Sequence, residues 1–177
     1  YTDFVMHVRA TEAALGGDKL PLTEAVARYL FKLMAYKDEY EVARLHTDTA
    51  FKTRVGAMFE GDFRLAYHLA LPLWARKNAQ GELQKARFGS WMGLAFRALA
   101  PLKVLRGTAL DVFGYTQERC EERALIVEYR EAIKSMLPSL NLGNLSAAVA
   151  FAKVPEHIRG YGHVKARHLR SAKVQWA

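Results

Sequence analysis

The sequence has only one cysteine, Cys120, among its 177 residues. A single thiol excludes an internal disulfide framework and favours a reducing compartment. Iron–sulfur clusters require several thiolate ligands and structural zinc usually requires more than one, so neither centre can be built from the cysteines of this chain alone. We therefore predict that the chain holds no cofactor or metal of its own. We also expect Cys120, which lies in a charged run, to be chemically inert.

Long hydrophobic runs and targeting signals are lacking too. Lys32 and Lys37 interrupt the richest apolar stretch, and no run approaches the ~20 residues that a membrane-spanning helix needs. Tyr1 opens directly into a mixed polar and apolar segment, without the pattern of a secretory leader and without an initiator methionine. We expect a cytoplasmic protein with no membrane partner, and either a trimmed start or a longer parent chain.

Motifs for catalysis and metal binding are scarce. His157, His163 and His168 are separated by six and five positions, whereas two metal ligands on one helix face lie three or four apart. The sequence contains no H-E-x-x-H, no E-x-x-H, no G-x-S-x-G elbow and no P-loop. Neighbouring carboxylates on a helix diverge, which favours a solvated face for Asp38, Glu39 and Glu41. We predict no catalytic residue, although a nucleophile and base assembled from distant positions stays an open alternative.

The composition is that of a globular domain, with 51% hydrophobic and 25% charged residues. The formal net charge is +8, and the excess is unevenly distributed. Residues 74–107 contain seven Lys or Arg against Glu82, and residues 153–177 contain six against Glu156. Such asymmetry predicts an anionic partner, which could be a nucleic acid, a phosphorylated cofactor or an acidic protein surface.

Hydrophobic periodicity predicts a mainly α fold. We expect a single compact helical domain over residues 1–177, with a short β-hairpin excursion around residues 62–89. The longest expected helix covers residues 23–46 and has Thr23 as its N-cap. Pro101 should kink or break a basic helix over 91–105. Further helices are expected at 4–15, 48–59, 116–137, 145–154 and from about 164, a strand at 63–69, and a hairpin at 74–88 with its turn at 78–81.

The run from Arg159 to Lys165 is the most suggestive local pattern. Gly160 and Gly162 would allow the backbone to approach a ligand closely just before a helix begins. The helix N-terminus, together with Arg159, His163 and Lys165, would favour a phosphate or carboxylate. The alternative interpretation is a tight turn in which glycine supplies a positive φ. We name these five residues as a candidate anion site.

The basic helix around residues 91–106 allows a second interpretation. Arg97, Lys103 and Arg106 lie near Trp91 and Phe96, and aromatic stacking beside a cationic track is the physical basis of single-strand nucleic-acid binding. The same aromatic residues are also what a hydrophobic core needs, and no known nucleic-acid motif is present. A core role is favoured, and nucleic acid is the less expected partner.

Several long strings of the sequence are distinctive when they are taken in order. The longest runs from Leu22 to Leu45. The others are Phe59–Phe63, His68–Ala70, Phe88–Met92, Leu105–Thr108, Phe113–Thr116 with Glu118 and Arg119, and Ile158–Lys165. In this order the strings resemble a segment near the C-terminus of the large fused indolepyruvate:ferredoxin oxidoreductases, which are 2-oxoacid:ferredoxin oxidoreductases. The resemblance spans nearly the whole chain.

The resemblance implies a parent enzyme that oxidatively decarboxylates an aryl-pyruvate to an acyl-CoA and passes electrons to ferredoxin. It implies thiamine diphosphate, iron–sulfur clusters and CoA in other modules of that parent. This chain has no thiamine-type G-D-G, so no catalytic residue carries over. We expect a C-terminal accessory domain that docks with other domains or subunits and is not catalytic alone. The alternative from another class is a basic helical nucleic-acid-binding module.

Overall fold

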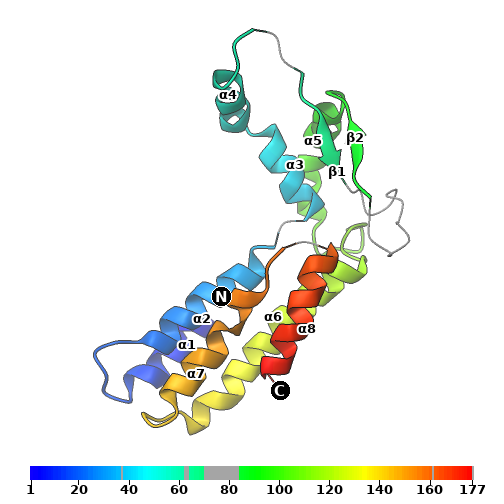
Figure 1. The fold of residues 1–177 in the computed structure, drawn as a ribbon. Coiled ribbons are helices and arrows are strands. Elements are labelled where there is room, and N and C mark those ends of the chain that lie inside the picture. Colours follow the sequence, from blue (N-terminus) through cyan, green and yellow to red (C-terminus); the bar gives the residue numbers. More distant parts are fainter. Residues whose placement is uncertain (37, 62–63, 70–83, 161, 177) are drawn as a thin grey trace. The chain divides into compact units, whose positions relative to one another are not determined.

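The computed structural model describes residues 1–36, 38–61, 64–69, 84–160 and 162–176. The chain is mostly helical with a small antiparallel sheet, which confirms the predicted fold class. Its contacts group into two compact units, shown in Figure 1. Unit 1 consists of residues 1–36 and 121–177, and unit 2 consists of residues 37–120. The expectation of one domain over residues 1–177 stays a prediction.

Unit 1 is built from helices that pack alongside one another (Figure 1). Its helix α2 packs against both α1 and α7, and the short helix η3 packs against α8. The element bounds are α1 Thr2–Ala13, α2 Pro21–Met34, α6 Gln117–Met136, η2 Leu137–Ser139, α7 Leu145–Lys153, η3 Val154–His157 and α8 Gly162–Trp176, with the first residues of α6 belonging to unit 2.

The core of unit 1 forms where the apolar stripes of these helices meet. Val26 and Leu30 on α2 are fully buried, as are Tyr129 and Ile133 on α6. Both pairs have the four-residue spacing of one helix face, which places their side chains on the same side. These two stripes therefore form the buried faces of α2 and α6.

The beginning of α2 differs from the prediction. The helix starts at Pro21, and Thr23 is not its N-cap. Instead the buried carboxylate of Glu12, at the end of α1, accepts the backbone N–H groups of Leu22 at 2.8 Å and Thr23 at 2.7 Å. The Thr23 hydroxyl donates to the same carboxylate at 2.6 Å. A distant carboxylate thus satisfies the N–H groups that a helix leaves unpaired at its start.

The helix expected over residues 23–46 is interrupted. Helix α2 ends at Met34, and α3 covers Glu39–Thr47. Asp38 has an extended backbone, and its Oδ1 accepts the backbone N–H of Glu41 at 2.8 Å. This geometry is that of an N-cap, and a strong N-cap starts a new helix even where hydrophobic periodicity continues through it.

Unit 2 has a smaller hydrophobic core of its own. Ala43 of α3, Tyr67 of β1, and Met92 and Phe96 of α5 form its buried cluster. The strands pair in antiparallel register, Tyr67 with Phe88 and Leu69 with Ala86. This pairing confirms a β excursion within 62–89, whereas the predicted turn at 78–81 lies outside the described residues. The remaining bounds are α4 Thr49–Ala57, β1 Tyr67–Leu69, β2 Ala86–Phe88, α5 Met92–Leu99 and η1 Ala100–Leu105, so that the predicted break near Pro101 is present.

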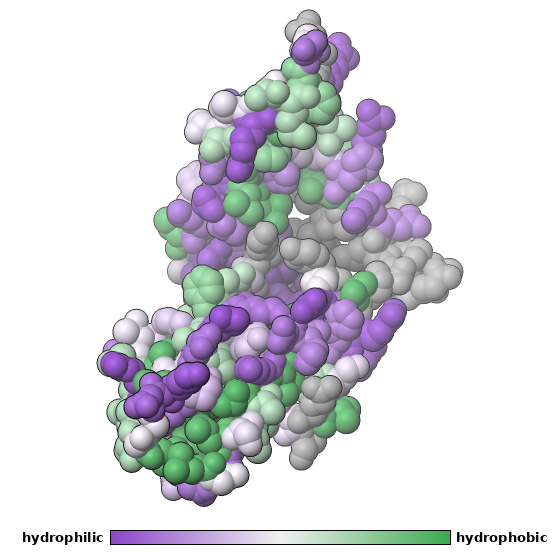
Figure 2. Space-filling view, turned by 60° about the vertical axis from the view of Figure 1, so that its left-hand side comes forward, coloured by the Kyte–Doolittle hydropathy of each residue, from purple (hydrophilic) through white to green (hydrophobic). Residues whose placement is uncertain are grey.

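Apolar side chains also reach the surface of each unit. Phe31 and Val174 are exposed in unit 1, and Met58, Trp91 and Val104 in unit 2. Figure 2 shows hydrophobic (green) and hydrophilic (purple) residues interspersed over the visible surface. Across the part of the chain that the structure describes, no helix combines the length and apolar character needed to cross a bilayer.

Candidate functional site

The candidate anion site lies in unit 1, where η3 passes into α8. Gly160 has a φ of +87°, a region that favours glycine. A Cβ atom at Gly160 would lie 2.7 Å from Cγ1 of Val164, which is closer than real Cβ atoms approach. The turn therefore requires glycine for both conformation and space. Gly162 begins α8, and the side chain of His163 lies outside the described residues.

Arg159 is used within this turn. Its Nε donates to the carbonyl oxygen of Glu156 at 3.1 Å, and its Nη2 lies 3.8 Å from Oε1 of the same residue. The carbonyl oxygen of Arg159 lies 2.8 Å from Nδ1 of His168 in α8. The side chain of Arg159 is mostly exposed, so its ion pair with Glu156 contributes little stability. Its main role in the structure is to hold the turn against η3 and α8.

Lys165 forms an ion pair between α8 and α6. Its Nζ contacts Oε1 of Glu122, and the two side chains are only 22% and 8% exposed. Losing either partner of such a shielded pair leaves an uncompensated charge away from water. The protein itself therefore neutralises Lys165.

Two residues of α2 that the sequence did not single out complete the site. The hydroxyl of Tyr29 donates to Oε2 of Glu156 at 2.8 Å. The Nζ of Lys32 donates to the carbonyl oxygens of Pro155 at 2.8 Å and Glu156 at 3.0 Å. Tyr29 and Lys32 are three positions apart, so both can reach η3 from one face of α2. We call Tyr29, Lys32, Glu156, Arg159 and Lys165 the Glu156 cluster.

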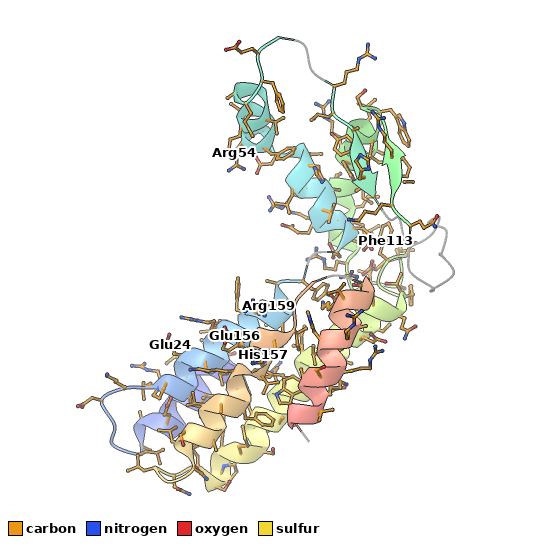
Figure 3. The ribbon with its side chains drawn as sticks, viewed as in Figure 1. Glu24, Arg54, Phe113, Glu156, His157 and Arg159 are labelled. Carbon is orange, nitrogen blue, oxygen red and sulfur yellow. The ribbon has the colours of Figure 1, made fainter. Side chains whose placement is uncertain are left out.

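The charges of the Glu156 cluster shift one another. The pKa of the Glu156 carboxyl is lowered, chiefly by the hydrogen bond from Tyr29 and also by nearby Arg159 and Lys32. Burial, and then Glu156, raises the pKa of the Tyr29 phenol. Burial lowers the pKa of Lys32, and the positive charges of Arg159 and Lys165 add to that effect. Arg159 and Lys165 therefore lie close enough to Lys32 to repel its charge. Figure 3 labels Glu156 and Arg159 of this cluster.

The Glu156 cluster gathers positive charge at the start of α8, but each cation already has an oxygen partner. Lys32 bonds two carbonyls, Arg159 bonds Glu156, and Lys165 pairs with Glu122. An incoming phosphate would compete with those oxygens. These contacts link η3 to α2 and α8 to α6. Anion binding by Arg159, Gly160, Gly162, His163 and Lys165 stays a prediction.

Unit 2 contains a buried carboxylate, Asp111, that the sequence patterns did not single out. Oδ1 of Asp111 accepts the hydroxyl of Tyr40 at 3.2 Å and the backbone N–H of Gly114 at 3.1 Å. Oδ2 accepts the backbone N–H of Gly107 at 2.9 Å. A Cβ atom at Gly114 would lie 2.5 Å from Oδ2, so glycine lets the loop close on the carboxylate. The ring of Phe113 packs edge-on against Tyr40 at 5.3 Å.

Asp38 links the start of α3 to the end of η1. Nε and Nη2 of Arg106 reach its two carboxylate oxygens at 2.6 and 2.8 Å, a bidentate pairing. The carboxylate is almost fully buried, so the prediction of a solvated face is wrong for Asp38. Arg106 is therefore paired within the chain and Phe96 is buried in the core, as the favoured core role predicts for Phe96, and both residues are less available for the alternative nucleic-acid track.

His46 lies in an aromatic enclosure of unit 2. Its ring stacks on Phe96 at 5.0 Å between centroids and meets Phe51 and Tyr67 edge-on at 5.5 and 5.4 Å. Burial lowers the pKa of the His46 imidazole. Nδ1 is buried with no hydrogen-bond partner among the described residues, and this favours the neutral ring.

The other sequence candidates remain apart. Cys120 is exposed, and its Sγ lies 3.6 Å from the carbonyl oxygen of Gly114. Among the residues that the structure describes, no three His, Cys, Asp or Glu side chains come together as metal ligands would.

Glu39 is partly buried, and burial raises the pKa of its carboxyl. A raised pKa alone does not make Glu39 an acid or base, because that role also needs a reacting group within hydrogen-bond reach.

Comparison with known proteins adds one match. The model of a family described as a family of unknown function, DUF6537, matches residues 1–177. No curated protein and no solved structure matches the chain.

Proposed function

The chain belongs to the DUF6537 family, and from the resemblance of its sequence strings, together with its contacts, we propose that it is a non-catalytic accessory segment of a larger 2-oxoacid:ferredoxin oxidoreductase. In this proposal the parent oxidises an aryl-pyruvate, such as indolepyruvate, to an acyl-CoA. Thiamine diphosphate, iron–sulfur clusters and CoA are held by other modules. The segment helps the parent to assemble and provides a surface for docking. The parent is cytoplasmic, and ferredoxin is one of its partners.

The ordered strings of resemblance support the identity of the parent. They extend from Leu22 to Lys165 and cover both units. The string from Leu22 to Leu45 contributes nearly all of α2 and most of α3. Strings of this length and order are more specific than a three-residue motif, because chance matches rarely retain their order along a chain.

One structural observation supports the accessory role: the polar side chains of the clusters described above make their contacts within the chain itself. Asp38 caps α3 and binds Arg106, and Asp111 holds a loop closed. Glu156 links η3 to α2, and Lys165 links α8 to α6. A reactive acid, base or nucleophile needs access to a substrate, whereas each of these groups is hydrogen-bonded or ion-paired to a protein partner, and Asp38 and Asp111 are also buried.

The size of the native protein that contains this segment tests the proposal first. An antibody against the segment should detect a cellular species far heavier than the 20.0 kDa of this chain. The purified species should reduce a viologen dye when it is given indolepyruvate and CoA. A cellular species of about 20 kDa, or a heavy species that oxidises no 2-oxoacid, would reject the assignment.

A variant of the same native protein separates an accessory role from a catalytic one. Asp111→Ala should lower the yield and thermal stability of the assembled parent but leave kcat per assembled enzyme unchanged, because Asp111 holds a loop within its own unit. Asp18→Ala is the matched control, since Asp18 is exposed. A fall in kcat with assembly intact would show that the segment participates in the reaction.

A further inference from the structure

Helix α5 of unit 2 is apolar on two opposite sides. Met92 and Phe96 lie four positions apart and are buried in the core. Trp91, at the N-cap, and Leu94 point away from that core and are 59% and 66% exposed. A helix that is apolar nearly all round is normally buried all round.

The exposed side of α5 is continuous. Trp91, Leu94, Ala95 and Ala98 are all exposed, and their spacings of three and four place them next to one another on one face. Trp91 does not hang free, because its ring meets Phe88 edge-on at 6.0 Å. We call Trp91, Leu94, Ala95 and Ala98 the α5 face. An exposed tryptophan whose ring is held by a neighbouring side chain is a typical anchor of a protein interface.

Positive charge borders the α5 face on both sides in the sequence. Residues 84–110 contain no Asp or Glu. Arg87 on β2, Arg97 on α5 and Lys103 on η1 are exposed, and within the described residues none of them forms an ion pair. Arg106 differs, because it is paired with Asp38. An apolar strip whose basic border forms no such ion pairs is complementary to an apolar strip with an acidic border.

We propose that the α5 face docks an acidic amphipathic helix of a partner polypeptide. The apolar side of that helix covers Trp91 and Leu94, and its carboxylates pair with Arg97 and Lys103. Helix α5 has 8 residues, about 12 Å, so the contact spans roughly two helical turns. A second copy of this chain is a poorer occupant, because it would bring the same basic border against this one. Docking of this kind does not depend on the chemistry of the parent enzyme.

The test measures binding of a fluorescein-labelled synthetic helix built only from leucine and glutamate, with leucines along one face. We expect its anisotropy to rise with the full chain, and the corresponding lysine–leucine helix to bind far less. Trp91→Ala and Arg97→Glu should each weaken the binding of the acidic helix about tenfold. Leu142→Ser and Arg9→Glu are controls for lost apolar area and reversed charge, because both side chains are exposed in unit 1.

Several outcomes would overturn the proposal. Equal binding of both helices would show nonspecific apolar contact. Equal weakening by the control variants would show that net charge, and not the α5 face, attracts the helix. A preference for oligothymidine or for phosphatidylserine vesicles that Trp91→Ala and Arg97→Glu abolish would make the face a nucleic-acid or lipid surface instead. Circular dichroism of each variant establishes that it is folded before its binding is compared.

Discussion

At the scale of single residues, Asp111 has the greatest consequence in unit 2. Asp111→Ala removes the acceptor from the Tyr40 hydroxyl and from the N–H groups of Gly107 and Gly114. Buried donors that lose their acceptors are costly, and we expect the free energy of unfolding to fall by about 2 to 4 kcal/mol. Urea denaturation measures the change.

Asp111→Asn is the matched comparison for that prediction. An asparagine keeps one carbonyl acceptor in nearly the same volume, so it should restore part of the lost stability. Asp18→Ala, at an exposed position, should change the free energy of unfolding little. If Asp111→Ala proved no worse than Asp18→Ala, the carboxylate would not hold the loop.

His46 leads to a prediction on pH. Burial lowers the pKa of its imidazole below the ordinary 6.5 in the folded chain. Between the folded pKa and 6.5 the unfolded chain binds more protons, so stability falls as the pH falls through that range. The NMR titration of His46 should give a midpoint below 6.5, and urea unfolding should show lower stability at about pH 5 than at about pH 7.

His46→Phe identifies the source of that pH dependence. Phenylalanine retains the aromatic packing and has no proton to gain, so the variant should lose less stability than the natural chain on acidification. An unchanged acid sensitivity would assign the effect to other groups.

At the scale of elements, Gly160 controls how α8 begins. Gly160→Ala should destabilise the chain by more than the ~1 to 2 kcal/mol of a left-handed backbone alone, because its Cβ would also meet Val164 at 2.7 Å. Gly61 is a close control, with a φ of +80° and open space within 4 Å of where a Cβ would lie. Thermal unfolding should rank Gly160→Ala below Gly61→Ala, and equal effects would mean that the Val164 contact yields easily.

The sequence was informative where local chemistry decides an element. Alternation over 63–69 predicted β1, although the strand covers only Tyr67–Leu69, and Pro101 predicted the end of α5. The break before α3 was missed because Asp38 sits in a charged run that resembles a solvated helix face. Its burial depends on Arg106, far away in the sequence.

The candidate site shows the same division. Arg159, Gly160 and Lys165 were found because they lie within one short run. Glu122, the ion-pair partner of Lys165, was not found, since it comes from α6 and only folding brings it to α8. Lys32 of α2 was missed for the same reason, because folding alone places it near Arg159 and Lys165. Sequence patterns identify residues with useful chemistry, but they do not show whether the protein has already paired those residues.

At the scale of the molecule, each unit has its own core, and stability changes should remain local. Glu12→Ala uncaps α2 in unit 1, whereas Asp111→Ala opens a loop in unit 2. Hydrogen exchange followed by mass spectrometry should show faster exchange mainly in residues 1–36 and 121–176 for Glu12→Ala, and mainly in residues 38–120 for Asp111→Ala. Loss of protection throughout the chain in either variant would show that the units unfold together.

Three buried tyrosines lead to a prediction on stability in alkaline solution. Tyr29, Tyr40 and Tyr129 each donate a hydrogen bond to an oxygen, and burial raises the pKa of each above its ordinary 10.0. A raised folded pKa means that the stabilisation is present at neutral pH and disappears as the pH climbs past about 10. Phenolate absorbance from these three side chains should therefore be delayed beyond about pH 10, so that ultraviolet absorption reports the loosening of the fold without any added label.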